Sequence, residues 1–399
     1  MPAPRFLVPA NPRLSRRFLR ARAGRAESAP GATVPRRFPV CWARHALYHG
    51  LAALGVGPGS HVLMPAYICR VAVEPVIALG AEVEFYGIAR DGRPDLDDIE
   101  SRAQARTRAL VLVHYFGFPQ QSEGLRALCA RRGISLVEDC AHVLRSEGAG
   151  LEMGRIGDIA VYSWAKFLPV PDGGELVLND PDRQLGVRWE VEGLLLTLRS
   201  VQGVLDELVA GSTGPARTLY RWLQAPKRLL RRPMEAAALP GDPDEGFEAR
   251  TANFPASRVS RWIAAHSDTA AIAAKRRENY LFLLEAVSGL AGVTPLLPTL
   301  PAGVCPWVFP VFFDNLPEGH RRLRERGIPA ASWDGVRPPS VPRGVYPAAD
   351  FLYDRAVFLP VHQSLEPEHL RLIVEGVREV RPRAGEEASG GRGARPRTS

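Results

Sequence analysis

Cysteine is scarce in this 399-residue chain, and long apolar runs are missing. The five cysteines are scattered and lack CxxC spacing: Cys41, Cys69, Cys129, Cys140 and Cys305. This argues against a disulfide framework or zinc motif and favours a reducing compartment, the cytoplasm. No apolar run approaches the roughly 18 residues of a membrane-spanning helix. Hydrophobic residues make up 46% and charged residues 24%, a composition that excludes global disorder, a collagen-like chain and a coiled coil.

Lysine is even rarer than cysteine, and nearly all basic residues are arginines. Only Lys166, Lys227 and Lys275 occur among 51 basic residues. A lysine in an apolar setting is therefore less easily explained here as one of many surface residues.

The positive charge is concentrated at the two ends of the chain. The formal net charge is +8, but residues 1–40 hold nine Arg against one Glu, and residues 381–399 hold five Arg against two Glu. The body between them consequently carries −3. Both ends are rich in Pro, Gly, Ala and Ser, so we expect a flexible leader over 1–40 and a disordered tail over 381–399. The body has no basic excess for binding nucleic acid, and any membrane contact would be peripheral, through the tails.

Between residues 42 and 180, short apolar strands alternate with helical patterns. This alternation predicts a mostly parallel sheet covered by helices on both faces. The expected helices are 42–54, 71–79, 95–101 and 125–132, and the expected strands are 61–64, 81–86, 109–114, 135–138, 159–163 and 175–179.

The remainder of the chain has a different pattern. Residues 181–250 predict a mostly helical excursion, completing a large domain over 41–250. Its basic cluster at 221–232 is either a solvated helix face or an amphipathic membrane-surface helix, and the solvated face is favoured. A helix over 258–287, strands at 293–297 and 307–313 and a helix over 366–380 predict a smaller α+β domain over 251–380.

Polar residues follow several predicted strands, at the edge where open α/β sheets bind ligands. Asp139 follows one strand, and Ser163 and Lys166 follow another. A lysine among apolar residues loses its proton more readily, and its amine is then the nucleophile of Schiff-base chemistry. Pyridoxal phosphate (PLP) needs such a lysine, a carboxylate for its ring nitrogen, a phosphate cradle and packing on its ring faces. Alone, Asp139 could be a helix cap and Lys166 a surface residue; their order before the Gly173-Gly174 turn favours the cofactor site.

Four ordered motifs resemble the nucleotide-sugar aminotransferases of the DegT/StrS type. They are PGSHVLMPAYIC (58–69), TRALVLVHYFGFP (107–119), GISLVEDCAH (133–142) and GRIGDIAVYSWAKFLPVPDGGELVLND (154–180). In the last, the glycine pair lies seven and eight residues after Lys166, as in the family. The resemblance is good over roughly 40–180 and loose over 250–380. It implies the PLP-dependent transferase fold of type I, with a mostly parallel sheet between helices and a smaller C-terminal domain.

The resemblance also implies roles for individual residues. Lys166 would form the aldimine with PLP and shuttle protons, and Asp139 would pair with the pyridine nitrogen. Ala141 and His142 would pack on and bond the cofactor, and Ser163 would bond its phosphate. Asn253 would reach the phosphate of a neighbouring subunit, which makes a homodimer with shared sites the expected assembly.

Several positions depart from the family pattern. Arg44 replaces a small hydroxyl residue of the phosphate-binding motif, where an arginine can still serve a phosphate bidentately or simply face solvent. Cys69 stands where the family has a ring-stacking aromatic, so either Tyr67 takes over or something smaller covers the ring. Only two residues separate Ser163 from Lys166, and Pro255 replaces an arginine.

Other candidates carry weaker signals. His114 ends a strand and could touch substrate or cofactor, or make a structural hydrogen bond. His362 is expected to be structural. Trp333, Asp334 and Arg337 lie in a proline-rich loop that is a candidate for binding a sugar or nucleotide.

The expected function is a PLP-dependent aminotransferase that moves an amino group, from glutamate, onto a keto group of a nucleotide-linked sugar. One alternative is a PLP-dependent sugar dehydratase, although such relatives often lose the lysine retained here as Lys166. The other is a non-catalytic PLP-fold regulator or scaffold in polysaccharide biosynthesis, which retention of both Lys166 and Asp139 disfavours.

Overall fold

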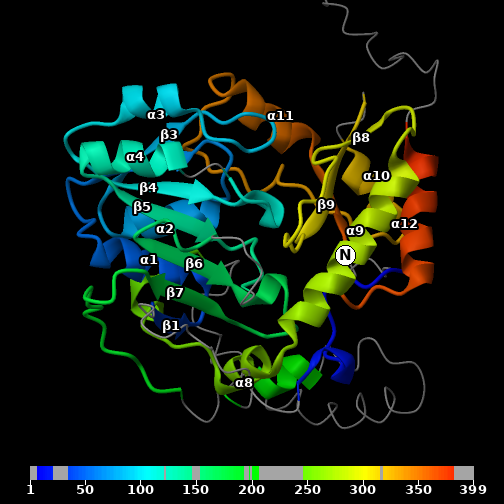
Figure 1. The fold of residues 1–399 in the computed structure, drawn as a ribbon, viewed down its shortest axis with the longest axis horizontal. Helices are drawn as coiled ribbons and strands as arrows, with labels where there is room; N and C mark the ends of the chain where they lie inside the picture. Colours follow the sequence, from blue (N-terminus) through cyan, green and yellow to red (C-terminus); the bar gives the residue numbers. More distant parts are fainter. Residues whose placement is uncertain are drawn as a thin grey trace, which may run out of the picture.

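The computed structural model describes residues 7–20, 35–120, 123–145, 153–192, 197, 200–205, 246–314 and 318–381. Two sheets organise these residues (Figure 1). A seven-stranded sheet has the order β1-β7-β6-β5-β4-β2-β3, and a three-stranded sheet has the order β10-β9-β8. The predicted α/β architecture with a smaller C-terminal unit is confirmed.

The large sheet is mostly parallel. Strands β3, β2, β4, β5 and β6 run parallel, β7 runs antiparallel to them, and the edge strand β1, antiparallel to β7, again follows their direction. Its strands are β1 (Arg36–Val40), β2 (His61–Pro65), β3 (Glu82–Tyr86), β4 (Thr107–Val113), β5 (Ser135–Cys140), β6 (Ile159–Ser163) and β7 (Gly174–Leu178). The apolar run of β4 explains its central place, because parallel strands covered on both faces are buried throughout.

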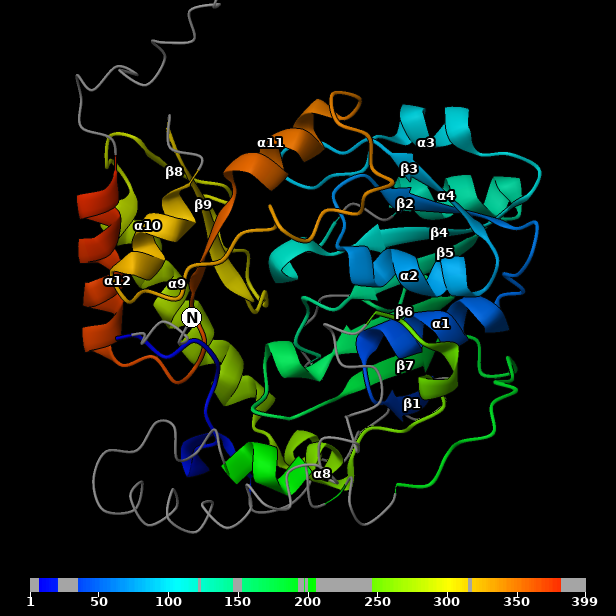
Figure 2. The ribbon, with the colours of Figure 1, turned by 180° about the vertical axis from the view of Figure 1, so that it is seen from behind.

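Helices cover both faces of this sheet, as right-handed crossovers require. Figures 1 and 2 show α1 and α2 together on one face, and α3 and α4 toward the other. The helices are α1 (Ala43–Ala53), α2 (Arg70–Ala78), α3 (Leu96–Arg102) and α4 (Glu123–Arg132). Helix α1 ends where Gly55 adopts a left-handed φ of 78°, the usual glycine termination.

Strand register decides which side chains share a face of the sheet. Asp139 pairs with Val161, and Val161 pairs with Leu176. A Cβ on Gly50 of α1 would meet Leu176, so this row faces α1. Tyr162 pairs with Glu175, one residue along. Because strand side chains alternate with period two, Glu175 lies on the opposite face from Asp139.

The small sheet and its helices form the second unit. Its elements are α9 (Thr269–Val287), β8 (Val293–Pro295), β9 (Val308–Phe313), α10 (Gly319–Glu325), α11 (Pro347–Arg355), β10 (Val357–Pro360) and α12 (Pro367–Val380), with α8 (Arg258–His266) preceding them. The single helix predicted over 258–287 is wrong, since α8 and α9 are separate. The break lies at Ser267 and Asp268: the Ser267 hydroxyl bonds back to Ile263, and Asp268 caps α9 by accepting the Ala271 N–H.

The leader expected over 1–40 is partly structured. Residues Arg36–Val40 form β1, which pairs with β7, and the Pro9 carbonyl accepts a hydrogen bond from His362. A flexible leader is therefore wrong for these described residues. The basic cluster at 221–232, most of the predicted excursion and the tail beyond Arg381 lie outside the described residues. No helix in the described ranges is long and apolar enough to cross a membrane.

Candidate active site

The carboxyl ends of β4, β5 and β6 are neighbours at one edge of the sheet. They bring together His114, Asp139 and the turn Trp164–Lys166 that follows Ser163. The edge predicted from sequence therefore carries the predicted catalytic residues, and ligands of open α/β sheets bind at this edge.

Lys166 ends a short 3-10 turn and is half-buried. Burial lowers its pKa, because an ammonium is costly to desolvate. The Cys69 thiol and the Asp139 carboxyl act in the opposite direction. Its Nζ lies 4.1 Å from the ring centroid of Trp307. The amine thus loses its proton more easily than an exposed lysine, as a nucleophile must.

Asp139 is only 9% exposed. Burial raises its pKa, while the Ala141 N–H, Lys166 and His114 lower it. The Ala141 N–H donates to Oδ1 at 2.9 Å. A buried carboxyl with a cation nearby can hold a proton or a negative charge opposite a ring nitrogen.

His142 is buried against an aromatic group of the small unit. Its ring stacks on Trp307, with centroids 4.1 Å apart and planes 20° apart. Its Nδ1 accepts the Phe116 N–H at 3.2 Å, which leaves the ring proton on Nε2. Burial, and secondarily Lys166, hold the pKa of His142 well below its usual value. His142 is therefore a neutral donor through Nε2.

Several aromatic residues lie near Cys69 and Lys166, and which of them would cover the cofactor ring stays a prediction. Tyr67 is fully buried with its ring against Trp333 at 4.7 Å and Tyr353 at 4.8 Å. Its hydroxyl has no hydrogen-bond partner among the described residues. Trp307 is instead the ring that touches both Lys166 and His142.

Sequence reasoning missed Trp307. It lies 141 residues after Lys166 in the chain and reaches the edge of the large sheet from the start of β9. No spacing rule connects positions so far apart, and the only local signal was an aromatic residue at the start of the strand predicted over 307–313.

A close backbone approach forms the opposite end of the site. Ser163 pairs with Gly174, and a Cβ on Gly174 would lie 2.4 Å from the Ala43 nitrogen. Gly173 adopts a φ of 129°, which favours glycine. The turn after Lys166 is thus held against the first residues of α1, and N–H groups at a helix N-terminus can bind an anion.

Arg44 is the second residue of α1 and is nearly buried. Its Nη1 lies 3.9 Å from Glu74 Oε2. The solvent-facing alternative for Arg44 is wrong, because its side chain is only 5% exposed.

Asn253 lies beside β1, in a segment bridged to it through Pro255 and Val40. It is half-buried, and its carbonyl accepts the Glu190 N–H at 3.0 Å. Its role toward the phosphate of a second subunit stays a prediction.

These features fit PLP as a group. The site offers a desolvated amine at Lys166, a buried carboxyl at Asp139 and a neutral donor at His142. Glycines at 173 and 174 leave room where side chains would collide with Trp164 and Ala43.

His114 has a structural role. Its Nδ1 accepts the Gln120 N–H at 3.1 Å, and its Nε2 donates to Glu138 at 3.0 Å. Glu138 also accepts N–H groups from Gly154, Ile156 and Gly157. The side-chain ligand atoms of His114, Glu138 and Cys140 lie within 4.8 Å of one another, close enough to hold a metal ion. The Glu138 oxygens, however, already accept these hydrogen bonds.

The remaining candidates also have internal partners. His362 bonds the Pro9 carbonyl, and burial lowers its pKa to about 3, consistent with the predicted structural role. Arg337 pairs with Asp350 at 2.6 Å, and Trp333 is buried against Tyr67. The proline-rich loop thus packs onto the core.

Known proteins with sequences similar to this chain include sugar aminotransferases. Residues 39–189 match the model of the DegT/DnrJ/EryC1/StrS aminotransferase family. The chain is 32% identical over 147 residues to the UDP-N-acetyl-3-dehydro-alpha-D-glucosamine 3-aminotransferase of Acidithiobacillus ferrooxidans, covering 36% of this chain and 40% of the relative. It is 31% identical over 140 residues to the dTDP-4-dehydro-2,3,6-trideoxy-D-glucose 4-aminotransferase of Saccharopolyspora spinosa, covering 34% and 36%. The match thus spans about two fifths of the length of these curated relatives.

Solved structures resemble the chain over a longer stretch. The aminotransferase TlmJ from Streptoalloteichus hindustanus has a TM-score of 0.61 at 23% identity, covering 86% of this chain and 85% of that one. DesV from S. venezuelae, solved in complex with a ketimine intermediate, also scores 0.61 at 23% identity, covering 87% and 85%. At this identity the likeness concerns the fold.

Proposed function

We propose that the chain is a PLP-dependent sugar aminotransferase of the DegT/DnrJ/EryC1/StrS family, whose model residues 39–189 match. It would transfer an amino group, with glutamate as donor, onto a keto group of a nucleotide-linked sugar. The observation that carries the proposal is the half-buried amine of Lys166 beside the buried carboxyl of Asp139. The printed names of the two curated relatives, which act on UDP- and dTDP-linked keto sugars, support the substrate class.

PLP, when bound, supplies a ring that accepts the electron pair released as the donor carbon loses its proton. Lys166 would take and return that proton at Nζ, a role helped by its lowered pKa. Asp139 would hold the charge of the ring nitrogen. His142 would donate through Nε2 to an oxygen of the cofactor.

The phosphate would lie at the N-terminus of α1. Ser163 and Arg44 would bind it together with the first N–H groups of that helix. Trp307 would shield Lys166 from water, since its ring already lies against Nζ. Cys69, at the start of α2, would leave the opposite side of the ring less covered than in the family pattern.

Borohydride labelling tests the cofactor assignment. The full-length protein is incubated with PLP, reduced and digested, and the modified lysine is identified by mass spectrometry. We expect the label on Lys166 and none in the Lys166→Ala variant, with Lys275→Arg as the matched control. A label elsewhere, or no label, would refute the assignment.

Product analysis separates the reaction classes. With glutamate and a UDP- or dTDP-linked keto sugar, the proposal requires 2-oxoglutarate and an amino sugar in equal amounts. Loss of water from the sugar without 2-oxoglutarate would instead identify a dehydratase.

The homodimer with shared sites can be tested by complementation. Lys166→Ala and Asn253→Ala subunits would each be inactive alone. If Asn253 serves the phosphate of the partner, mixed dimers regain one intact site and part of the activity. If Asn253 acts within its own subunit, mixing restores nothing.

A further inference from the structure

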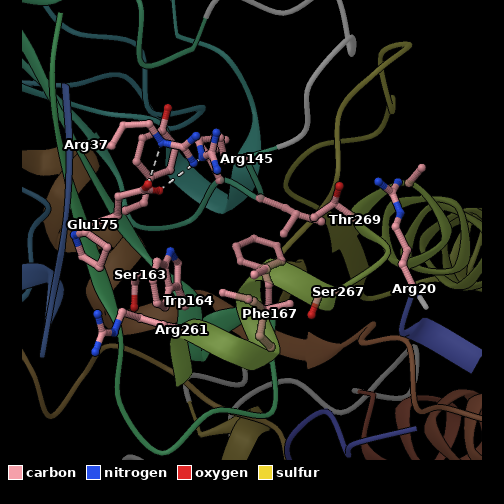
Figure 3. Close-up of a pocket in the computed structure, with 18 residues that line it drawn as sticks. Arg20, Arg37, Arg145, Ser163, Trp164, Phe167, Glu175, Arg261, Ser267 and Thr269 are labelled. Atoms are coloured by element: carbon pink, nitrogen blue, oxygen red, sulfur yellow. Dashed lines mark hydrogen bonds and ion pairs between the residues drawn. The ribbon is translucent and has the colours of Figure 1, made fainter. Parts of the chain in front are cut away.

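A cavity of about 470 Å³ lies behind the turn that carries Lys166. Trp164 and Phe167, the neighbours of that turn, line it (Figure 3). Glu175 lines it as well, and strand register places Glu175 on the face of the sheet opposite Asp139. The cavity therefore extends over the face of the sheet opposite Asp139, and it shares Ser163 and the Lys166 turn with the candidate active site.

Two arginines at one end of the cavity are fixed by a buried carboxylate. Arg37 Nε contacts Glu175 Oε1 at 2.8 Å, and Arg145 Nε contacts Oε2 at 3.2 Å. The Glu175 side chain is only 4% exposed, whereas those of Arg37 and Arg145 are 31% and 36% exposed. One carboxylate thus orients two guanidinium groups that also reach solvent.

Two further arginines complete the lining. Arg20 lies at the other end of the cavity beside Thr269, and Arg261 lies on a third side (Figure 3). Arg20 pairs with Asp268 at 3.2 Å in a solvent-exposed pair of the weak kind. Arg261 is 44% exposed and lies 4.0 Å from the buried Glu192 carboxylate. Among the described lining residues, four guanidinium groups face a single carboxylate.

The rest of the lining has an apolar wall as well as the hydroxyl residues Tyr162, Ser163, Ser267 and Thr269. Val143, Leu144, Phe167 and Leu168 contribute side chains, with Trp164 beside them. A cavity of this size suits a small organic molecule rather than a bare ion, since ligand pockets span roughly 300–1,000 Å³. Guanidinium groups bind phosphate bidentately.

We propose that this cavity binds a small phosphorylated organic molecule, with its phosphate on the arginines and its carbon skeleton on the apolar wall. The ligand would rest against Trp164 and Phe167, on either side of Lys166 in the chain. The binding site does not depend on the proposed aminotransferase activity.

Calorimetric titration with phenyl phosphate tests the proposal on the full-length protein, both free of cofactor and saturated with PLP that is then fixed by borohydride reduction, with the excess PLP removed because free PLP could itself enter the cavity. Phenyl phosphate carries both features of the ligand; inorganic phosphate and phenol each carry one. We expect phenyl phosphate to bind more tightly than inorganic phosphate, and phenol not to bind measurably. The PLP-saturated protein should bind it equally well.

Variants locate the binding. The pair Arg20→Gln/Arg261→Gln leaves the Glu175 cluster intact and should weaken binding by about tenfold or more, because a charge-assisted hydrogen bond contributes roughly 1.5–3 kcal/mol. Arg20→Lys/Arg261→Lys should restore part of it, since charge is kept but the planar fork is lost. Arg326→Gln is the matched control, being 40% exposed and paired with Glu379 at 2.9 Å.

Three results would overturn the proposal. The first is no binding of phenyl phosphate to either form. The second is binding abolished by PLP, which would place the probe in the cofactor site. The third is equal affinity in the Arg20/Arg261 and Arg326 variants.

Discussion

At Lys166, desolvation and nearby acidic groups act in opposite directions. Burial lowers the pKa and is the larger effect, while Cys69 and Asp139 favour the charged amine. The balance leaves an amine that is partly protected from water and more easily deprotonated than a surface lysine. Both properties suit a group that must take up and release protons at neutral pH.

This balance predicts the effect of Asp139→Asn on Lys166. The Asp139 carboxylate raises the pKa of Lys166, so its removal should lower that pKa further. The pH dependence of Lys166 acetylation, followed by mass spectrometry, should shift to lower pH. Lys275, paired with Glu278 at 2.7 Å, is the internal reference and should not shift. An upward shift at Lys166 would contradict the assigned contact.

Glu138 forms several buried hydrogen bonds with its neighbours. It accepts three backbone N–H groups and the His114 ring proton, and it is fully buried. Glu138→Gln should destabilise the protein by about 3 kcal/mol or more. The amide nitrogen of Gln is itself a donor, so it could not form hydrogen bonds with the N–H groups that it would face. Urea unfolding measures this loss. Glu379→Gln, at a residue 64% exposed, should change stability little, and equal losses would refute the explanation.

At the level of elements, the sequence predicted what short-range patterns encode. Apolar runs between helical stretches located β2 to β7, and their polar ends located Asp139 and Lys166. The strand Arg36–Val40 was missed because its two arginines resemble the rest of an Arg-rich leader. They are tolerated because β1 is an edge strand, with Arg37 paired to Glu175.

Other parts of the site depend on contacts between distant elements. Trp307 and Lys166 meet only once the small unit lies against the large sheet. The helix break at Ser267 and Asp268 was overlooked although Asp is a common helix cap, because the flanking residues are helical on both sides.

The packing of β7 against α1 gives a prediction at the element scale. A Cβ at Gly174 would lie 2.4 Å from both the Ala43 nitrogen and the Trp42 carbonyl carbon. Since both are backbone atoms, Gly174→Ala should cost about 1–3 kcal/mol by overpacking and weaken PLP binding. Thermal unfolding and PLP titration measure the two effects. Gly186→Ala, where nothing lies within 4 Å, should do neither.

At the scale of the whole molecule, one buried arginine ties the two units together. Arg276 of α9 donates to the carbonyls of Lys166 at 3.2 Å and Trp307 at 3.0 Å, and to Gln363. Its guanidinium lies 4.6 Å from the Phe167 ring. Burial lowers its pKa to about 10, so it stays charged at neutral pH. It thereby holds the Lys166 turn and the Trp307 backbone in one arrangement.

Arg276→Lys tests whether a positive charge alone at this position is enough to keep the protein stable. Lysine keeps the charge but cannot reach several carbonyls at once, so we expect a loss of about 2–4 kcal/mol. Trypsin should also cleave the variant faster between the two units. Chemical unfolding and timed proteolysis test this, with Arg326→Lys as the exposed control. A variant as stable as the parent would show that Arg276 does not hold the units together.

The alternation of side chains along β6 and β7 limits how this protein can change by mutation. Neighbouring residues serve different sites: Val161 shares the Asp139 face, and Tyr162 shares the Glu175 face with the arginine cavity. A point substitution can therefore alter one site and spare the other. Insertion or deletion of a single codon in β6 would exchange the two faces and damage both sites at once, so length changes are far less tolerable here than substitutions.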